Sequence, residues 1–251
     1  MKCLWLKEPP HGGFFVCEII DYIDGMKNIL ARGGIEFLAV FLGIALSLWV
    51  NDWQENREIQ KRLVEDYNKI HMEVKTDIDN IENILGLNEK IIQTEEYLLA
   101  TINAEIDFNY DTVIQNIFQV IAPTFFGNQS AYSASVASGR FNTSKDDELI
   151  SKISNLYEHY YKRLVLNGDL LDQRSTVFGK EHSFIFYRPL YKQTNIDTSA
   201  IKEYFLSHEF HNGLLRFHDF RKRFYFMRLR DTKNQMIKVD SILTGYFSNN
   251  K

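Results

Sequence analysis

The chain has 251 residues, of which 45% are hydrophobic and 25% are charged, and its formal net charge at pH 7 is -4. Because 29 basic residues stand against 33 acidic ones, no overall field favours nucleic acid or an acidic surface, and a charged partner would have to meet a local patch. The two cysteines are Cys3 and Cys17, which excludes a disulfide framework and a CxxC zinc site from the main part of the chain.

The first 32 residues are predicted to be an N-terminal tail. Pro9, Pro10, Gly12 and Gly13 interrupt any apolar run, so the tail lacks the h-region of a signal peptide. Residues 17–30 place isoleucines among acidic neighbours, a pattern that favours an amphipathic helix lying on a membrane surface.

An uncharged run of fourteen residues, FLAVFLGIALSLWV, follows at positions 37–50. At ~1.5 Å per residue it covers about 21 Å, which is short of the ~30 Å hydrocarbon core of a membrane. A helix over residues 33–53 reaches about 31 Å and places Trp49 and Trp53 at one interface, where indole rings are favoured. We therefore predict a transmembrane helix over residues 33–53 rather than a buried helix of a soluble core, and this span must also be the targeting element.

Small and polar residues within the span are candidates for function. Ala39, Gly43 and Ser47 recur at every fourth position, a spacing that lets two helices approach closely and that also arises by chance in apolar helices. We take it to favour a homo-oligomer. Glu36 lies one turn inside the span, so it is a candidate for an ion or proton relay; the reading that we favour is that it pairs with Arg32 or reaches the headgroups.

The basic residues beside the span are nearly balanced between its two sides: Lys27 and Arg32 precede it, and Arg57, Lys61 and Arg62 follow it. The tail then decides the positive-inside rule, because Lys2, Lys7 and the terminal amine add positive charge to it. We predict a single-pass inner-membrane protein with a cytoplasmic tail and with residues 54–251 on the non-cytoplasmic side.

A regular apolar stripe predicts that the helix continues beyond the membrane as a stalk over residues 54–105. Its members are spaced 4, 4, 3, 4, 4, 3 and 4 residues apart: Ile59, Leu63, Tyr67, Ile70, Val74, Ile78, Ile81 and Leu85. Eleven residues in three turns give ~3.67 residues per turn, which is close to the natural helix period, so the helix should be nearly straight. Gly86 and Asn88 are predicted to bend or end it.

Residues 106–251 are predicted to form an antiparallel helical bundle that packs on the stalk, which makes the fold all-α. Asp111 is expected to cap a short helix that ends near Pro123, and Asp146 or Asp147 to cap a helix with an aromatic stripe. The serine-rich residues 130–139 contain no G-x-S-x-G elbow and are predicted to be a structural helix ended by Gly139.

The C-terminal third begins with the least helical stretch of the chain. Residues 183–191, SFIFYRPLY, predict an irregular or extended segment that has room for a short strand. Asp197 or Thr198 is expected to cap a last helical region over residues 200–247, with Gly213 as a break within it.

Three histidines of this last region, His208, His211 and His218, would lie near one face of a helix. Two histidines one turn apart can share a metal ion, although a third ligand and a supporting carboxylate have no assigned place. We regard surface or half-buried histidines as the simpler interpretation and expect no metal and no cofactor.

Six basic residues alternate with aromatic ones in the same region: Arg216, Arg221, Lys222, Arg223, Arg228 and Arg230. Such a basic patch could hold anionic lipid headgroups or stack on a nucleic acid strand. Because the six positions are spread around the helix, we expect internal pairing with the acidic stalk first, lipid contact second and nucleic acid last.

Several stretches resemble a known family. Residues 34–36, the apolar run and the residues VNDWQE at 50–55 are similar to the opening of the uncharacterised bacterial membrane proteins grouped as DUF6090, whose members read roughly GEI, apolar span and NNWNE. Further similarity covers residues 132–161 and, around EFHNGLL, residues 206–243. Asp52 stands where Asn is usual, and the tail is unusually long. The resemblance implies a single-pass, mostly helical inner-membrane protein and carries no activity.

We therefore predict a membrane-anchored, non-catalytic helical protein with an assembly, scaffolding or sensing role. Its expected partners are the lipid bilayer, further copies of itself and a protein of unknown identity. The alternatives are a membrane-anchored metal-dependent enzyme that uses the three histidines, and a binder of anionic lipid or nucleic acid through residues 216–230. No P-loop, HExxH, GxGxxG or EF-hand spacing occurs in the sequence.

Overall fold

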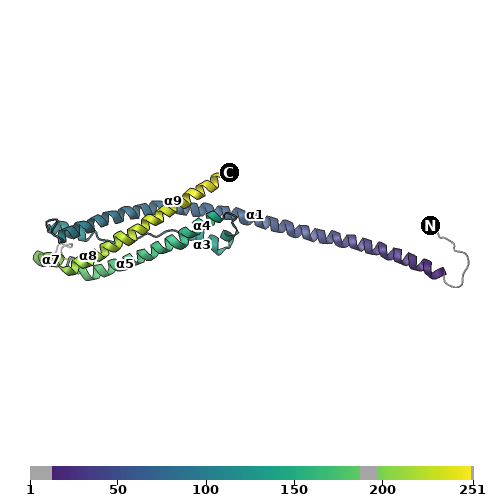
Figure 1. Ribbon diagram of the computed structural model, residues 1–251, viewed down its shortest axis with the longest axis horizontal. Coiled ribbons are helices and arrows are strands. Elements are labelled where there is room, and N and C mark those ends of the chain that lie inside the picture. Colours follow the sequence, from purple (N-terminus) through teal and green to yellow (C-terminus); the bar gives the residue numbers. More distant parts are fainter. Residues whose placement is uncertain (1–12, 187–196, 250–251) are drawn as a thin grey trace. The chain divides into compact units, whose positions relative to one another are not determined.

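The computed structural model describes residues 13–186 and 197–249 (Figure 1). These residues are helical or irregular and contain no β-strand, so the predicted all-α class is confirmed. They divide into two compact units, one up to residue 59 and one from residue 60 onward.

The longest element is α1, which runs over Gly13–Ile102 and contains 90 residues. It continues through Gly86 and Asn88, so the predicted helix end there is wrong. The Asn88 amide Nδ2 donates to the carbonyl oxygens of Ile84, one turn earlier in α1, and of Pro123, at 2.9 and 3.0 Å, so its side chain ties the continuing helix to the connecting chain. A single interior glycine costs only about 1 kcal/mol, which the packing of this segment offsets.

Three short helices follow α1 in the chain: α2 over Tyr110–Ile117, α3 over Ser130–Ala137 and the 3-10 helix η1 over Arg140–Thr143. Asn109 rather than Asp111 caps α2, because its side chain accepts from the Thr112 N–H, and α2 ends well before Pro123. The helix over the serine-rich residues is confirmed. Gly139 lies beyond it with a φ of 75°, the left-handed conformation that favours glycine.

Two long helical segments complete the chain. The first consists of α4 over Asp147–Asn155, the π-helical turn η2 over Leu156–Tyr161 and α5 over Lys162–His182. The second consists of α8 over His208–Phe220, the π-helical turn η4 over Arg221–Tyr225 and α9 over Phe226–Asn249. Asp146 caps α4 by accepting from the Leu149 N–H, as predicted.

Short elements connect the two long segments. Residues 183–186 form the 3-10 helix η3, Ser183–Phe186, instead of a strand, whereas the rest of the predicted extended segment lies outside the described residues. The helix α7, Thr198–Phe205, is capped by Asp197 as predicted. The predicted break at Gly213 is wrong. The chain breaks between Phe205 and His208, where Ser207 caps α8 by accepting from the Phe210 N–H.

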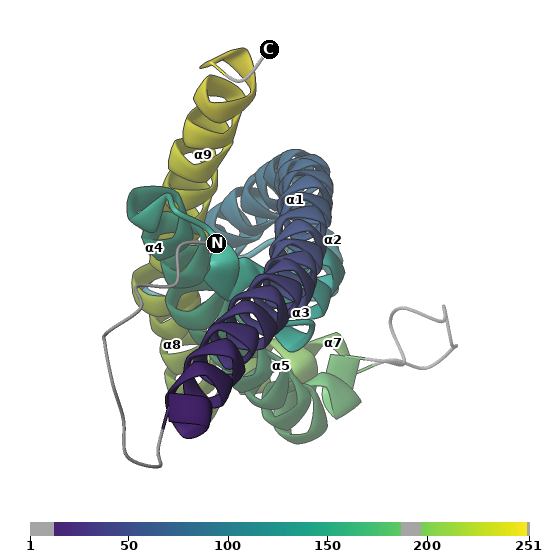
Figure 2. The ribbon, with the colours of Figure 1, turned by 90° about the vertical axis from the view of Figure 1, so that its right-hand side faces the viewer.

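The second unit is a bundle of three long helical segments (Figures 1 and 2). The last segment is antiparallel to α1, since the contacts Glu95–Arg221, Glu82–Lys233 and His71–Asp240 run in opposite directions along the two. It is also antiparallel to α5, since Phe178 meets Phe217 and Gly168 meets Tyr225. The segment from α4 to α5 runs parallel to α1, because residues 118–129 first carry the chain back along the bundle (Figure 1). One apolar core joins all three segments.

Candidate functional site

The predicted membrane residues lie in the first unit, on an exposed stretch of α1. All side chains from residue 34 to residue 53 are exposed, including Trp49 and Trp53, and the stretch is long and apolar enough to cross a membrane. Glu36, Ala39 and Ser47 share this stretch with Gly43, beside which the space for a methyl group is open. The Arg57 guanidinium lies 5.4 Å from the Trp53 ring centre. The side chain of Arg32 lies outside those described.

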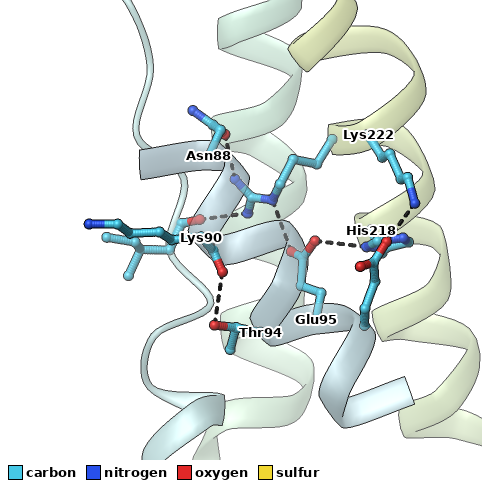
Figure 3. A network of polar contacts seen from close by, with 9 residues as sticks. Asn88, Lys90, Thr94, Glu95, His218 and Lys222 are labelled. Atoms are coloured by element: carbon cyan, nitrogen blue, oxygen red, sulfur yellow. Dashed lines mark hydrogen bonds and ion pairs between the residues drawn. The ribbon is translucent and has the colours of Figure 1, made fainter. Parts of the chain in front are cut away.

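A buried ionic network joins α1 to the last helical segment (Figure 3). Glu95 and Arg221 are both fully buried, and the Arg221 Nε–H donates to Glu95 Oε1 at 2.9 Å. The other carboxylate oxygen lies 3.1 Å from His218 Nδ1. Arg221 also donates to Asn88 Oδ1, at 3.0 Å, and to the Ile121 carbonyl oxygen. Burial of one charge costs several kcal/mol, and the ion pair and hydrogen bonds of Glu95 and Arg221 offset this cost.

The π-helical turn η4 positions the charged side chain of Arg221 in the core. Arg221 begins this wider turn and Tyr225 ends it, and both side chains are fully buried. The Tyr225 hydroxyl accepts from the Phe125 N–H at 2.8 Å, and burial raises the pKa of Tyr225. The turn thus places one guanidinium and one phenol within hydrogen-bond distance of the irregular chain at residues 121–125, and these bonds hold that chain against the bundle.

The π-helical turn η2 plays the same part on the opposite side of that connection. The Tyr161 hydroxyl donates to Asp77 at 2.7 Å, and the Asn128 N–H donates to the same carboxylate oxygen at 2.9 Å. Burial, and to a smaller extent the charge of Glu73, raises the pKa of Asp77 in spite of these two bonds. A methyl group on Gly127 would overlap the Tyr161 ring, so the glycine permits this close approach.

The remaining predicted basic residues do not form one surface. Three of them pair with carboxylates: Lys222 with Glu96, Arg223 with Asp219 and Arg228 with Asp231. The predicted pairing with α1 thus holds for Arg221 and Lys222. Exposed pairs of this kind contribute at most about 1 kcal/mol each. Arg216 and Arg230 are exposed, and the described part of the chain offers neither of them a carboxylate at ion-pair distance.

The three predicted histidines are in different environments. His208 is exposed, His211 is half-buried and His218 is buried against Glu95. Among the described side chains, those of residues 34–182, 185–186 and 197–249, no three from histidine, cysteine, aspartate or glutamate come close enough together to hold a metal ion.

A further functional candidate is a groove between α5 and α8, which lie side by side (Figure 2). It encloses about 330 Å³, and its lining is Leu170, Gln173, Arg174, Val177, Phe178, Glu181, His182, Gly213, Arg216 and Phe217. A second hollow of about 460 Å³ adjoins it and shares Arg174 and Arg216. The sequence did not predict this site, because Arg174 lies far from the basic patch in the chain. The one available signal was the spacing of Leu170, Arg174 and Val177 on one helix face.

His182 is a buried member of the lining of the groove. It is only 3% exposed, and its Nδ1 lies 2.9 Å from the Tyr204 hydroxyl. Burial lowers its pKa, although the charges of Glu181 and Glu209 act in the opposite direction. Gly213 faces the ring so closely that a methyl group there would overlap it. The imidazole is therefore fixed in position and uncharged at neutral pH.

Comparison with known proteins identifies the family. A family model described as "Family of unknown function (DUF6090)" matches residues 36–203, which is more than half of the chain. The chain belongs to DUF6090. The first two stretches of resemblance fall within the matched residues, except for positions 34 and 35, while residues 206–243 lie beyond them. No curated protein and no solved structure matches this DUF6090 chain.

Proposed function

We propose that this DUF6090 protein is a single-pass protein of the bacterial inner membrane, without catalytic activity, in an assembly, scaffolding or sensing role. One observation carries the proposal: the same helix, α1, supplies the exposed apolar stretch and one wall of the bundle core. Ile35 and Trp49 are 68% and 65% exposed, whereas Ile70 and Leu98 are fully buried.

The exposure of the first stretch supports a membrane environment. Within the described part of the chain, no neighbour covers the large apolar side chains from Ile35 to Trp53. In water, each of them would lack the favourable free energy of about 1.5–3 kcal/mol that burial of such a side chain provides. A bilayer restores that free energy. The length of the stretch, about 30 Å at ~1.5 Å per residue, matches the hydrocarbon core.

The bundle interior supports a binding role over a catalytic one. Two of its buried carboxylates are held by neighbouring groups: Glu95 by Arg221 and His218, and Asp77 by Tyr161 and the Asn128 N–H. These bonds hold helices and the connecting chain together, whereas the groove between α5 and α8 is accessible.

Membrane anchoring is tested by alkaline carbonate extraction. We expect the wild-type chain to stay with the membranes and the double variant Leu42→Lys/Leu46→Lys to be extracted, because each lysine at the centre of a span costs about 2.5–3.5 kcal/mol. Leu87→Lys, on the exposed side of α1 in the bundle, is the control and should stay in the membranes. Extraction of the wild-type chain would contradict the proposal.

The assembly role is tested by disulfide crosslinking in membranes, with Cys3 and Cys17 replaced by serine. Gly43→Cys should give crosslinked dimers, since the small residues allow two helices to approach there. Phe41→Cys, about 200° around the same helix, should not. Equal crosslinking at both positions would refute a specific pairing face. A reporter fused after Lys251 tests the predicted non-cytoplasmic location of the bundle.

A further inference from the structure

We propose that the groove between α5 and α8 binds a small organic anion, in which a carboxylate or phosphate monoester is attached to an apolar body about the size of one aromatic ring. Arg174 and Arg216 would hold the anionic group. This inference gives the proposed sensing role a class of ligand and rests on that role, but it concerns a site that the anchoring and assembly experiments do not touch.

The first support is the charge of the groove. Arg174 on α5 and Arg216 on α8 both line the groove and the adjoining hollow, so two guanidinium groups flank the boundary between the two spaces. In the described part of the chain, neither has a carboxylate at ion-pair distance. An anion in the space that both arginines line would meet two positive charges and could accept from their planar donor forks.

The acidic residues of the groove are already engaged or turned to solvent. Glu181 is the single carboxylate among the lining residues of the 330 Å³ space. Its side chain is 62% exposed, and its carboxylate lies 3.8 Å from His182 Nε2, on a ring that burial keeps neutral. Asp219, in the adjoining hollow, pairs with Arg223 at 2.6 Å. The positive charge of the two arginines is therefore not neutralised from within.

The second support is the apolar surface below the arginines. Phe178 and Phe217 stack with their ring centres 5.5 Å apart, and both line the groove. Val177, at its rim, is 51% exposed. A volume of about 330 Å³ lies at the lower end of the range for small-molecule sites, which are typically apolar with a few well-placed polar groups.

Arg174 is also positioned before a ligand arrives. The Arg174 guanidinium carbon lies 4.4 Å from the centre of the Phe220 ring, a cation–π contact that limits its rotamers. His182, held by Tyr204, adds an uncharged part of the lining. Binding therefore needs little ordering of Arg174 and His182, which lowers its entropic cost.

The test uses the full chain in phosphatidylcholine nanodiscs and isothermal titration calorimetry, with empty nanodiscs as the blank. The probes are 4-phenylbutyrate and phenyl phosphate, and neutral 4-phenylbutanamide is the uncharged comparison. We expect at least one oxyanion to bind at least about tenfold more tightly than the amide. The tighter of the two oxyanions identifies the preferred anionic group.

Two substitutions remove the charge of the groove, and one control removes the same charge elsewhere. Arg216→Gln and Arg174→Gln should each weaken oxyanion binding by about tenfold and leave binding of the amide unchanged. Arg216 is exposed, so its variant should fold even if Arg174→Gln, which loses the contact with Phe220, does not.

Arg230→Gln is the matched control, because Arg230 is exposed and lies outside the groove. The control should bind like the wild-type chain. Equal binding of oxyanion and amide to the wild type, or an equal loss in Arg230→Gln and Arg216→Gln, would overturn the proposal. So would the absence of binding by both oxyanions.

Discussion

Tyr157 and Tyr161 belong to the same π-helical turn, η2, and both are almost completely buried, but only Tyr161 has a partner for its hydroxyl. The Tyr157 hydroxyl finds no acceptor or donor among the described residues. We expect Tyr161→Phe to lower the free energy of unfolding by about 1–3 kcal/mol, since Asp77 loses a donor. Tyr157→Phe should be neutral or stabilise by about 1 kcal/mol, because it removes an unsatisfied polar group.

Urea unfolding of the full chain in detergent, followed by circular dichroism, measures both tyrosine variants. The cost of Tyr161→Phe should be larger at pH 8 than at pH 4. Burial raises the pKa of Asp77 in the folded state, so the carboxylate is charged, and most in need of its donor, above that pKa. Equal effects of the two substitutions would show that the Asp77–Tyr161 bond contributes nothing.

Arg221 and Lys222 are neighbours in sequence, and both pair with glutamates of α1, but Arg221 is fully buried and Lys222 is exposed. Arg221→Leu should lower the free energy of unfolding by about 3–5 kcal/mol, because it leaves Glu95 as a buried charge without its cation. Lys222→Gln should change it by no more than about 1 kcal/mol. Urea unfolding measures both variants. If Arg221→Leu lowers the free energy of unfolding only slightly, Glu95 must reach solvent.

His182 should make the bundle less stable in mild acid. Burial lowers its pKa below the unfolded value, so below about pH 6.5 the unfolded chain binds a proton that the folded chain excludes. The free energy of unfolding should therefore fall as the pH drops below about 6.5, with a slope of at most about 1.4 kcal/mol per pH unit from this group. The difference in the free energy of unfolding between the wild-type chain and His182→Gln, measured as a function of pH, gives the contribution of His182. If the two proteins lose stability in parallel as the pH falls, this prediction is wrong.

At the scale of helices, two interior glycines show how packing decides the meaning of the same residue. A methyl group at Gly213 of α8 would overlap the His182 ring, whereas one at Gly86 of α1 would meet nothing within 4 Å. We expect Gly213→Ala to destabilise by about 1–3 kcal/mol through overpacking. Gly86→Ala should stabilise by about 0.5–1 kcal/mol, because alanine has the higher helix propensity. Thermal unfolding followed by circular dichroism measures both variants. If both substitutions stabilise the protein, or both destabilise it, the contrast between the two glycines is wrong.

The elements that the sequence predicted well are those governed by local patterns. The apolar stripe from Leu63 to Ile81 and the caps at Asp146 and Asp197 follow from spacing and from side chains that reach a backbone N–H within three residues. The predicted helix breaks at Gly86 and Gly213 were wrong, because the helices continue through both glycines. Gly213 faces the His182 ring and Gly86 faces open space, and neither environment can be recognised from the neighbouring residues in the sequence.

The groove and the buried network depend on contacts between distant parts of the chain. Arg174 and Arg216 line the same groove only because α5 packs against α8, and Glu95 meets Arg221 across 126 residues. The sequence pattern therefore grouped Arg221 with the surface basic residues. Its burial depends on the wider turn η4, which has no recognisable signal in the residue types.

For the whole molecule, the division at residue 59 predicts that the bundle folds without the membrane stretch. All members of the buried apolar core, from Leu63 to Leu243, lie in the second unit. A chain shortened to residues 60–251 should be soluble, highly helical and cooperative in thermal unfolding.

Removal of the rest of α1 provides the control for this prediction. A chain of residues 106–251 loses Tyr67, Ile70 and Val74 from the core and leaves Arg221 without Glu95, so it should aggregate or remain unfolded. Circular dichroism and size-exclusion chromatography distinguish the two chains. Stable folding of the shorter one would show that α1 is not part of the bundle.

The two π-helical turns also affect which insertions and deletions the bundle can accept. Loss of one residue from the regular helix α9, for example the exposed Met227, would rotate the rest of α9 by about 100° relative to α8. Leu229, Met236 and Leu243 would then leave the core together. Loss of the exposed Phe224 from η4 should be better tolerated, because a turn closed by i→i+5 bonds holds one more residue than an α-helical turn and can shorten to one. The number of residues in α9 is thus a stricter requirement of this fold than the number in the π-helical turn that precedes it.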